Sequence, residues 1–436
     1  MPLKNYELPG PKARMILETQ AEYLSPSIST PLPLVWDRAE DCTVFDVDGN
    51  EFIDFSSGVL VTNTGHSHPK VVKAIQDQAA KLINCYDSAH PLRSQFVERL
   101  AGLMPEDLKT VLLMSSGSEA IDAAVKIARV VTGKHEVIGF DGAFHGRTYM
   151  AMSVGGLAGT KRGFGPLVPG ILRAPFPDYY RAPNGETPDQ VDERCLEALE
   201  RVLLTQSSGS VAALVTEPYQ GGGGSLVPSK RFLQGVRDFC TRHGILFILD
   251  EVQSSFGRTG RLFAFEHYDI VPDIVVLGKG IASGIPAAAI VARRSIASGL
   301  KPNSLSSTYG GNPLACAAGL ASIEVIVGDE LPARAAATGA MMTDRLNAMK
   351  ERHRFVGDVR GLGLVLAVEF VKSKESKEPD PVLARQFAEK LLTAGLSVMA
   401  PIGRGGNVLR ISPPLTITQA AANDGLDIIE ATLQRF

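Results

Sequence analysis

The sequence has few features of a secreted, membrane or nucleic-acid-binding protein. Its five cysteines are odd in number, widely spaced and without a Cys-x-x-Cys pair, which predicts reduced thiols. No dense Lys/Arg run is present and the net charge is only -3, so composition argues against nucleic acids and acidic membranes as partners. The longest apolar run, at 285–292, is too short for a membrane span, and residues 1–20 contain no secretory signal. We therefore expect a cytoplasmic protein that acts on small molecules.

Short apolar runs alternate with amphipathic stretches from about residue 65 to 325. Runs of this kind predict strands buried on both faces and separated by helices, which is typical of a parallel α/β sheet. The clearest candidates are 111–114, 211–215, 245–249 and 273–277. After Ser115, apolar residues at helical spacing predict a helix that ends at Gly133.

The chain is too long for one ordinary core, and its ends differ from its middle. We expect a large domain at 65–325 and a smaller α+β domain built from an N-terminal segment, 1–64, and a C-terminal segment, 326–436. The N-terminal segment contains a predicted hairpin at 44–55 around Asp48-Gly49. The C-terminal segment contains helical stretches and predicted strands at 361–371 and 408–412.

No metal site is expected. Asp46-x-Asp48-Gly49 is a fragment of a calcium loop, but the remaining ligand spacing fails. His66 and His68 lack further ligands nearby in the sequence.

Three features follow predicted strands, at the edge where open α/β sheets bind ligands. Ser116-Gly117-Ser118 begins a helix, where free backbone N–H groups favour a phosphate, although a plain N-cap is the simpler interpretation. Asp250 follows an apolar strand and needs a partner, either a structural cation or a protonated ring nitrogen of a ligand. Lys279 lies between two glycines after another strand, an unusual place for a lysine. Burial there would lower its pKa, as Schiff-base chemistry requires.

A phosphate site, a carboxylate for a pyridinium nitrogen and an amine for an aldehyde are together what pyridoxal phosphate (PLP) requires. The sequence also resembles the class III aminotransferases of the fold type I PLP enzymes, from about residue 30 to the end. The motifs are NTGHSHP (63–69), SSGSEAIDAAVKIAR (115–129), GAFHGRT (142–148), TEPYQG (216–221), LDEVQSSFGRTG (249–260), LGKGIASGIP (277–286) and STYGGNPLAC (307–316).

The resemblance implies a large domain with a mainly parallel seven-stranded sheet, and a role for each matching residue. Lys279 matches the Schiff-base lysine and Asp250 the partner of the ring nitrogen. The other matches are cofactor contacts: Ser116, Gly117 and Ser118 at the phosphate, Phe144 and Val252 on the two faces of the ring, His145 in the same motif as Phe144, Gln253 near the phenolic oxygen, and Thr308, which reaches the phosphate from a neighbouring subunit. A homodimer, or a pair of dimers, is therefore expected.

The implied reaction moves an amino group from an amino acid or amine to a 2-oxo acid, pyruvate or 2-oxoglutarate, by a ping-pong mechanism. Arg147 and Arg410 match arginines that hold the distal carboxylate and the α-carboxylate of substrates. Glu217 is expected in a polar network beneath the cofactor. The family's 4-aminobutyrate and ornithine enzymes have a glutamate that pairs with the second arginine, where this chain has Gly222. That departure favours substrates with an α-carboxylate and disfavours 4-aminobutyrate.

Other activities remain as alternatives. A dialkylglycine decarboxylase-like enzyme resembles this chain in lacking the glutamate, but Val59 replaces its pocket glutamine and cannot donate a hydrogen bond to a leaving carboxylate. An amino-acid racemase of the same family ranks third. A nicotinamide oxidoreductase is disfavoured because Gly361-x-Gly363 lacks the third glycine and reads as a strand. A non-catalytic scaffold is disfavoured because Lys279 and Asp250 are both present.

Overall fold

The computed structural model of the protein describes residues 3–28, 32–105 and 107–436. Its largest sheet has seven strands, all mutually parallel except one, β10. In spatial order they are β4 (Leu108–Met114), β10 (Ala288–Arg293), β9 (Ile274–Leu277), β8 (Leu246–Asp250), β7 (Val211–Thr216), β5 (Glu136–Phe140) and β6 (Ile171–Ala174). The predicted α/β class, with its mainly parallel sheet, is confirmed.

The central strands of this sheet are buried on both faces. Every residue of β5, β7 and β9 is buried, and these strands are rich in Val, Ile and Leu. Because no face meets water, their sequences are continuous apolar runs rather than alternating ones. All four runs that predict strands coincide with β4, β7, β8 and β9.

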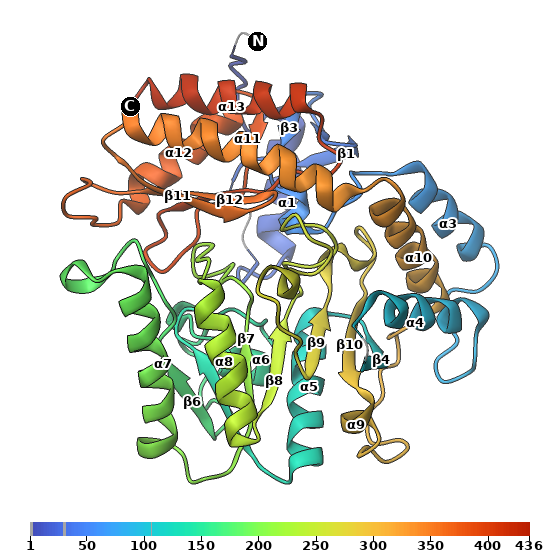
Figure 1. The fold of residues 1–436 in the computed structure, drawn as a ribbon. Helices are drawn as coiled ribbons and strands as arrows, with labels where there is room; N and C mark the ends of the chain where they lie inside the picture. The colour runs from blue at the N-terminus through green and yellow to red at the C-terminus, as the bar shows by residue number, and fades with distance from the viewer. Residues whose placement is uncertain (1–2, 29–31, 106) are drawn as a thin grey trace.

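Helices cover the faces of the large sheet (Figure 1). The helix expected after Ser115 is α5 (Gly117–Thr132), which packs its apolar face on the sheet. It ends at Gly133, whose left-handed φ of 67° allows the N–H group to bond to the carbonyl of Arg129. The other helices of this part are α3 (Pro69–Ala79), α4 (Pro91–Leu103), α6 (Tyr149–Val154), α7 (Pro188–Thr205), α8 (Lys230–His243), α9 (Arg294–Ala297) and α10 (Pro313–Gly328).

Two smaller sheets form the upper part of the molecule in Figure 1. One joins the two ends of the chain, because β13 (Leu396–Ser397) pairs with β3 (Glu51–Asp54), which follows β1 (Trp36–Glu40) and β2 (Thr43–Asp46). The other contains β11 (Val356–Leu362), β12 (Val365–Phe370) and β14 (Val408–Ile411). The remaining helices are α1 (Pro11–Tyr23), α2 (Ser57–Leu60), α11 (Leu331–Arg352), α12 (Pro381–Thr393) and α13 (Gln419–Leu433). A smaller α+β unit built from both ends is therefore confirmed.

The hairpin expected at 44–55 is present as β2 and β3, with Gly49 at a φ of 90°. Its aspartates have structural roles: Asp48 accepts hydrogen bonds from the first turn of α1, and Asp46 accepts them from Asp48 and Asn50. The described residues contain no cluster of three or more potential metal ligands.

The single strand expected at 361–371 is wrong. Strand β11 ends at Leu362 and β12 begins at Val365. The turn between them contains Gly363, where φ is 52°. A Cβ on Gly363 would lie 2.4 Å from the backbone of Thr259, so glycine allows this turn to pack closely against the large sheet's loops.

Candidate active site

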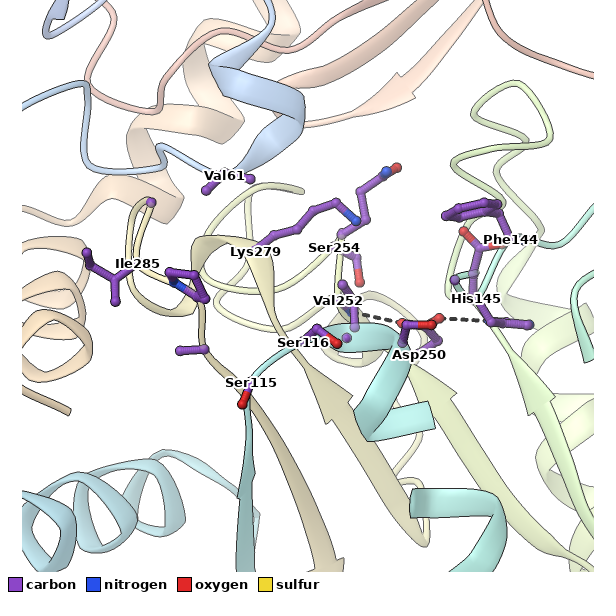
Figure 2. A pocket seen from close by; sticks show the side chains of 18 of the residues that line it. Val61, Ser115, Ser116, Phe144, His145, Asp250, Val252, Ser254, Lys279 and Ile285 are labelled. Carbon is purple, nitrogen blue, oxygen red and sulfur yellow. Dashed lines mark hydrogen bonds and ion pairs between the residues drawn. The ribbon is translucent and has the colours of Figure 1, made fainter. Parts of the chain in front are cut away.

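A cavity of about 320 Å³ lies at the carboxyl ends of β4, β5, β7, β8 and β9 (Figure 2). Parallel strands bring the residues that follow them to one edge, which explains why motifs far apart in the sequence meet here. Ten of the fourteen residues predicted for the site line this cavity, and they are Ser116, Gly117, Ser118, Phe144, His145, Glu217, Asp250, Val252, Gln253 and Lys279.

Lys279 extends into this cavity (Figure 2). It begins the short turn 279–281 with a φ of 44°, and the adjacent Gly280 allows close packing because a Cβ there would lie 2.3 Å from Asn63. Burial lowers the pKa of the Lys279 ammonium, while Asp250 acts in the opposite direction. The neutral amine, which is the nucleophilic form, is therefore easier to reach here than on an exposed lysine.

Asp250 is the last residue of β8 and is 5% exposed. Its Oδ2 lies 2.7 Å from Nδ1 of His145, and its Oδ1 accepts the N–H of Val252 at 3.0 Å. The Nε2 atom of His145 is buried without a hydrogen-bond partner among the described residues. His145 therefore orients one carboxylate oxygen of Asp250, a contact that the sequence alone did not reveal.

The start of α5 combines an N-cap with close packing. Ser116 caps the helix by accepting the N–H of Glu119 at 3.2 Å, as the simpler interpretation of this motif expected. Ser118 Oγ accepts the N–H groups of Arg147 and Thr148 at 3.0 and 2.9 Å. A Cβ on Gly117 would lie 2.8 Å from Val252 Cγ1, so only glycine fits here without displacement.

Glu217 holds two loops of the site together. Its buried carboxylate accepts the N–H of Phe144 at 3.0 Å and that of Gly221 at 2.9 Å. Burial raises its pKa to about 7, because removal from water penalises the charged form. A Cβ on Gly222 would lie 2.7 Å from Phe144 Cβ and 3.3 Å from Leu157 Cδ1, so this loop packs directly on Phe144.

Arg410 is a buried guanidinium, 4% exposed, that has no ion pair with any described carboxylate. Its Nη1 donates to Gln253 Oε1 at 3.2 Å, its Nη2 lies 3.4 Å from Met399 Sδ, and its Nε has no partner among the described residues. Burial lowers its pKa to about 10. Tyr219 Oη also donates to Gln253 Oε1, at 3.0 Å. Tyr219 and Glu217 act in the opposite direction, but no carboxylate contacts Arg410 among the described residues, so an anionic group beside it would pair a buried charge.

Val59 does not line the cavity and is 47% exposed. It belongs to α2, where all four residues have positive φ, from 50° to 68°, so the turn is left-handed. Such a conformation costs about 1–2 kcal/mol for each residue other than Gly58, and buried contacts hold it, among them Ser57 Oγ to the carbonyl of Ser412 at 2.6 Å. The turn places Val61 in the cavity instead (Figure 2).

Arg147 and Thr308 are exposed, and both of them, like the buried Arg410, also lie outside the cavity lining. Conversely, sequence reasoning missed Tyr219 and Val61, which line it. Tyr219 belongs to the motif at 216–221, and Val61 lies two residues before the motif at 63–69. Their position close to matched residues could have identified them.

Comparisons with known proteins agree with this geometry. The family model for class III aminotransferases matches residues 24–433. A probable 4-aminobutyrate aminotransferase of Bacillus subtilis is 39% identical over 91% of this chain and 92% of its own length. An alanine/serine racemase of Pyrococcus horikoshii is 36% identical over 98% of this chain and 91% of its own.

A solved amine transaminase from an uncultivated Pseudomonas species, in its PLP-bound form, superposes with a TM-score of 0.90. It is 32% identical, and the match covers 95% of this chain and 98% of that one. Cofactor and reaction class follow from the family. The chain belongs to the class III aminotransferases, PLP-dependent enzymes that transfer an amino group between an amino donor and a 2-oxo acid.

Proposed function

We propose that Lys279 holds the aldehyde of PLP as a Schiff base and that Asp250 pairs with its ring nitrogen. When bound, the cofactor supplies an electron-accepting ring, and Asp250 keeps that ring protonated. The residues present fit this group, since a desolvated amine and a buried carboxylate face one cavity. Gly117 and Ser118, at the start of α5, fit its phosphate through backbone N–H groups. Phe144 and Val252 flank the remaining space.

Lys279 is also the proposed proton carrier. With a substrate bound, the Nζ amine of Lys279 would take the proton from the substrate carbon as general base. Burial lowers the pKa of this amine, which makes its uncharged form easier to reach. Glu217 positions Phe144 by accepting its backbone N–H, and so acts on the reaction through that ring.

The preferred substrates carry an α-carboxylate that binds Arg410. The observation that supports this proposal is the buried Arg410 guanidinium, which has no carboxylate partner among the described side chains. A planar carboxylate accepts two of its N–H groups at once. At Gly222 a longer side chain would displace Phe144, so this position offers no room for a competing glutamate. Arg410 therefore stays available, and 4-aminobutyrate is a poor donor. Arg147, exposed on the loop after Phe144, is proposed for a distal carboxylate.

Racemisation is the second candidate, because one relative that spans nearly the whole chain is an alanine/serine racemase. Decarboxylation has weaker support, since the apolar side chain of Val59 cannot donate a hydrogen bond to a carboxylate.

A panel of amino donors tested with pyruvate and 2-oxoglutarate separates these activities. We expect oxo-acid-dependent turnover of α-amino acids, with neither carbon dioxide release nor inversion of a single enantiomer in the absence of an oxo acid. 4-Aminobutyrate as the best donor would contradict the role given to Gly222. Borohydride treatment should fix the cofactor to Lys279, and a covalent adduct in Lys279→Ala would contradict that attachment.

We also propose a homodimer in which Thr308 completes the phosphate site of the neighbouring subunit. The support is the exposure of Thr308, away from its own chain's cavity, next to Tyr309, an aromatic side chain that is 67% exposed.

A mixture of two inactive variants tests this arrangement. In a hybrid of Lys279→Ala with Thr308→Ala chains, a threonine acting across the interface leaves one site intact, and activity returns. If Thr308 serves its own chain, no intact site forms and the mixture stays inactive. A monomer by light scattering would refute the dimer directly.

The division into 1–64, 65–325 and 326–436 remains a proposal, supported by the pairing of β3 with β13. Helix α10 runs three residues past the second boundary. A cytoplasmic location is likewise proposed, on the five free cysteines. None of the helices in the described ranges is long and apolar enough to cross a membrane.

A further inference from the structure

A second cavity, of about 400 Å³, lies between the end of β6, helix α7 and the strands β11, β12 and β14. It shares no lining residue with the cofactor cavity. Its lining carries four guanidinium groups but only two carboxylates. The arginines are Arg181, Arg194, Arg360 and Arg404, and the acids are Asp178 and Glu369.

The inner charges of this cavity are already paired. Glu369 is 2% exposed and forms ion pairs with Arg181 and Arg360, the latter at 2.6 Å. Arg360 also donates hydrogen bonds to Asp358 at 2.8 Å and to the carbonyl of Gly224 at 2.9 Å. These contacts connect β11 and β12 to the loop that contains Gly224.

The outer arginines keep donors to spare. Arg194 binds Glu186 only through Nε, and its two Nη groups have no hydrogen bond to any described residue. Arg404 has no ion pair with a described carboxylate, and its Nη2 donates to the carbonyl of Asp141 at 2.8 Å and to Gln220 Oε1 at 3.4 Å. Both arginines are exposed at the open side of the cavity.

Part of the cavity lining is apolar. Phe176, Leu226 and Val408 contribute to it, and all three are buried. The cavity therefore offers guanidinium N–H groups from exposed arginines together with buried apolar side chains. Its volume lies within the range of about 300–1,000 Å³ that is usual for small-molecule sites. A cluster of ion pairs with a purely structural role would require neither unpaired Nη groups nor a cavity.

We propose that this cavity is a second binding site, distinct from the active site, for a small di- or tricarboxylate. Its carboxylates would accept paired hydrogen bonds from Arg194 and Arg404, whose planar forks match that geometry. Its carbon skeleton would lie on the apolar part of the lining. Asp178 also lines the cavity and disfavours a ligand carboxylate placed directly beside it.

Calorimetric titration of the holoenzyme with citrate, at constant ionic strength and with saturating pyruvate, a monocarboxylate, present, tests the proposal. We expect one site per chain, with affinity reduced at least about ten-fold in both Arg194→Gln and Arg404→Gln. Arg201→Gln is the matched control, because Arg201 is exposed on the same helix as Arg194 but lies outside the cavity. It should bind citrate as the wild type does.

Three outcomes would overturn the site: no citrate binding, equal affinity in all variants, or displacement of citrate by pyruvate. Inorganic phosphate binding through the same arginines more tightly than citrate would overturn the carboxylate assignment. Cofactor absorbance, recorded on each variant, ensures that the active site is intact. Arg194→Gln provides the decisive comparison if Arg404→Gln fails to fold.

Discussion

Replacing Arg410 with methionine should stabilise the apoenzyme while removing its activity on carboxylate substrates. The lowering of the Arg410 pKa to about 10 corresponds to about 3 kcal/mol of unfavourable burial of its charge. The substitution loses one hydrogen bond to Gln253, worth about 1 kcal/mol. Gln253 Oε1 keeps its bond from Tyr219 Oη, so no buried acceptor is left alone. The net expectation is a gain of about 2 kcal/mol.

Thermal unfolding of the apoenzyme measures this gain as a rise of a few degrees in Tm. Arg410→Lys is the control, since it keeps a buried charge and should not stabilise the protein. In the holoenzyme, kcat/KM for α-amino acids should fall at least about 100-fold in Arg410→Met, because two charge-assisted hydrogen bonds are lost. Amines without a carboxylate should be spared. A destabilised apoenzyme, or unchanged kcat/KM for α-amino acids, would refute the unpaired-cation argument.

Three other predictions concern the cavity walls. Gly117→Ala should weaken cofactor affinity, read by equilibrium dialysis, since its Cβ would lie 2.8 Å from Val252; unchanged affinity would show that the wall yields. Gly222→Glu should displace Phe144 and lower kcat with all donors, and wild-type kinetics would contradict the packing. Glu217 has a pKa raised by burial to about 7, so the folded state binds its proton more tightly than the unfolded state. Its contribution to stability is full below about pH 4.5 and falls until about pH 7. Glu217→Gln should flatten this decline in the apoenzyme's Tm, and an unaltered slope would refute the assignment.

Much of the fold is readable from the sequence because the central strands are continuous apolar runs. A strand buried on both faces needs such a run, and helices of period 3.6 between the runs leave few topologies. The helix at 117–132 is equally local, with Ser116 at its start and Gly133 at its end. The turn at Gly363 escaped prediction because hydrophobic residues continue on both sides of it, and only the approach of Thr259 reveals why glycine is there.

The sequence by itself determined the class of chemistry, because Ser116–Ser118, Asp250 and Lys279 lie at strand ends that must meet at one sheet edge and the motifs around them resemble those of one family. Tertiary structure decided what surrounds them. The contact of His145 with Asp250 joins residues 105 positions apart. The left-handed turn that exposes Val59 depends on buried contacts that no propensity encodes. The unpaired state of Arg410 is likewise a property of the packed interior. Burial removes water from its guanidinium, so an anion that pairs with this charge would stabilise it.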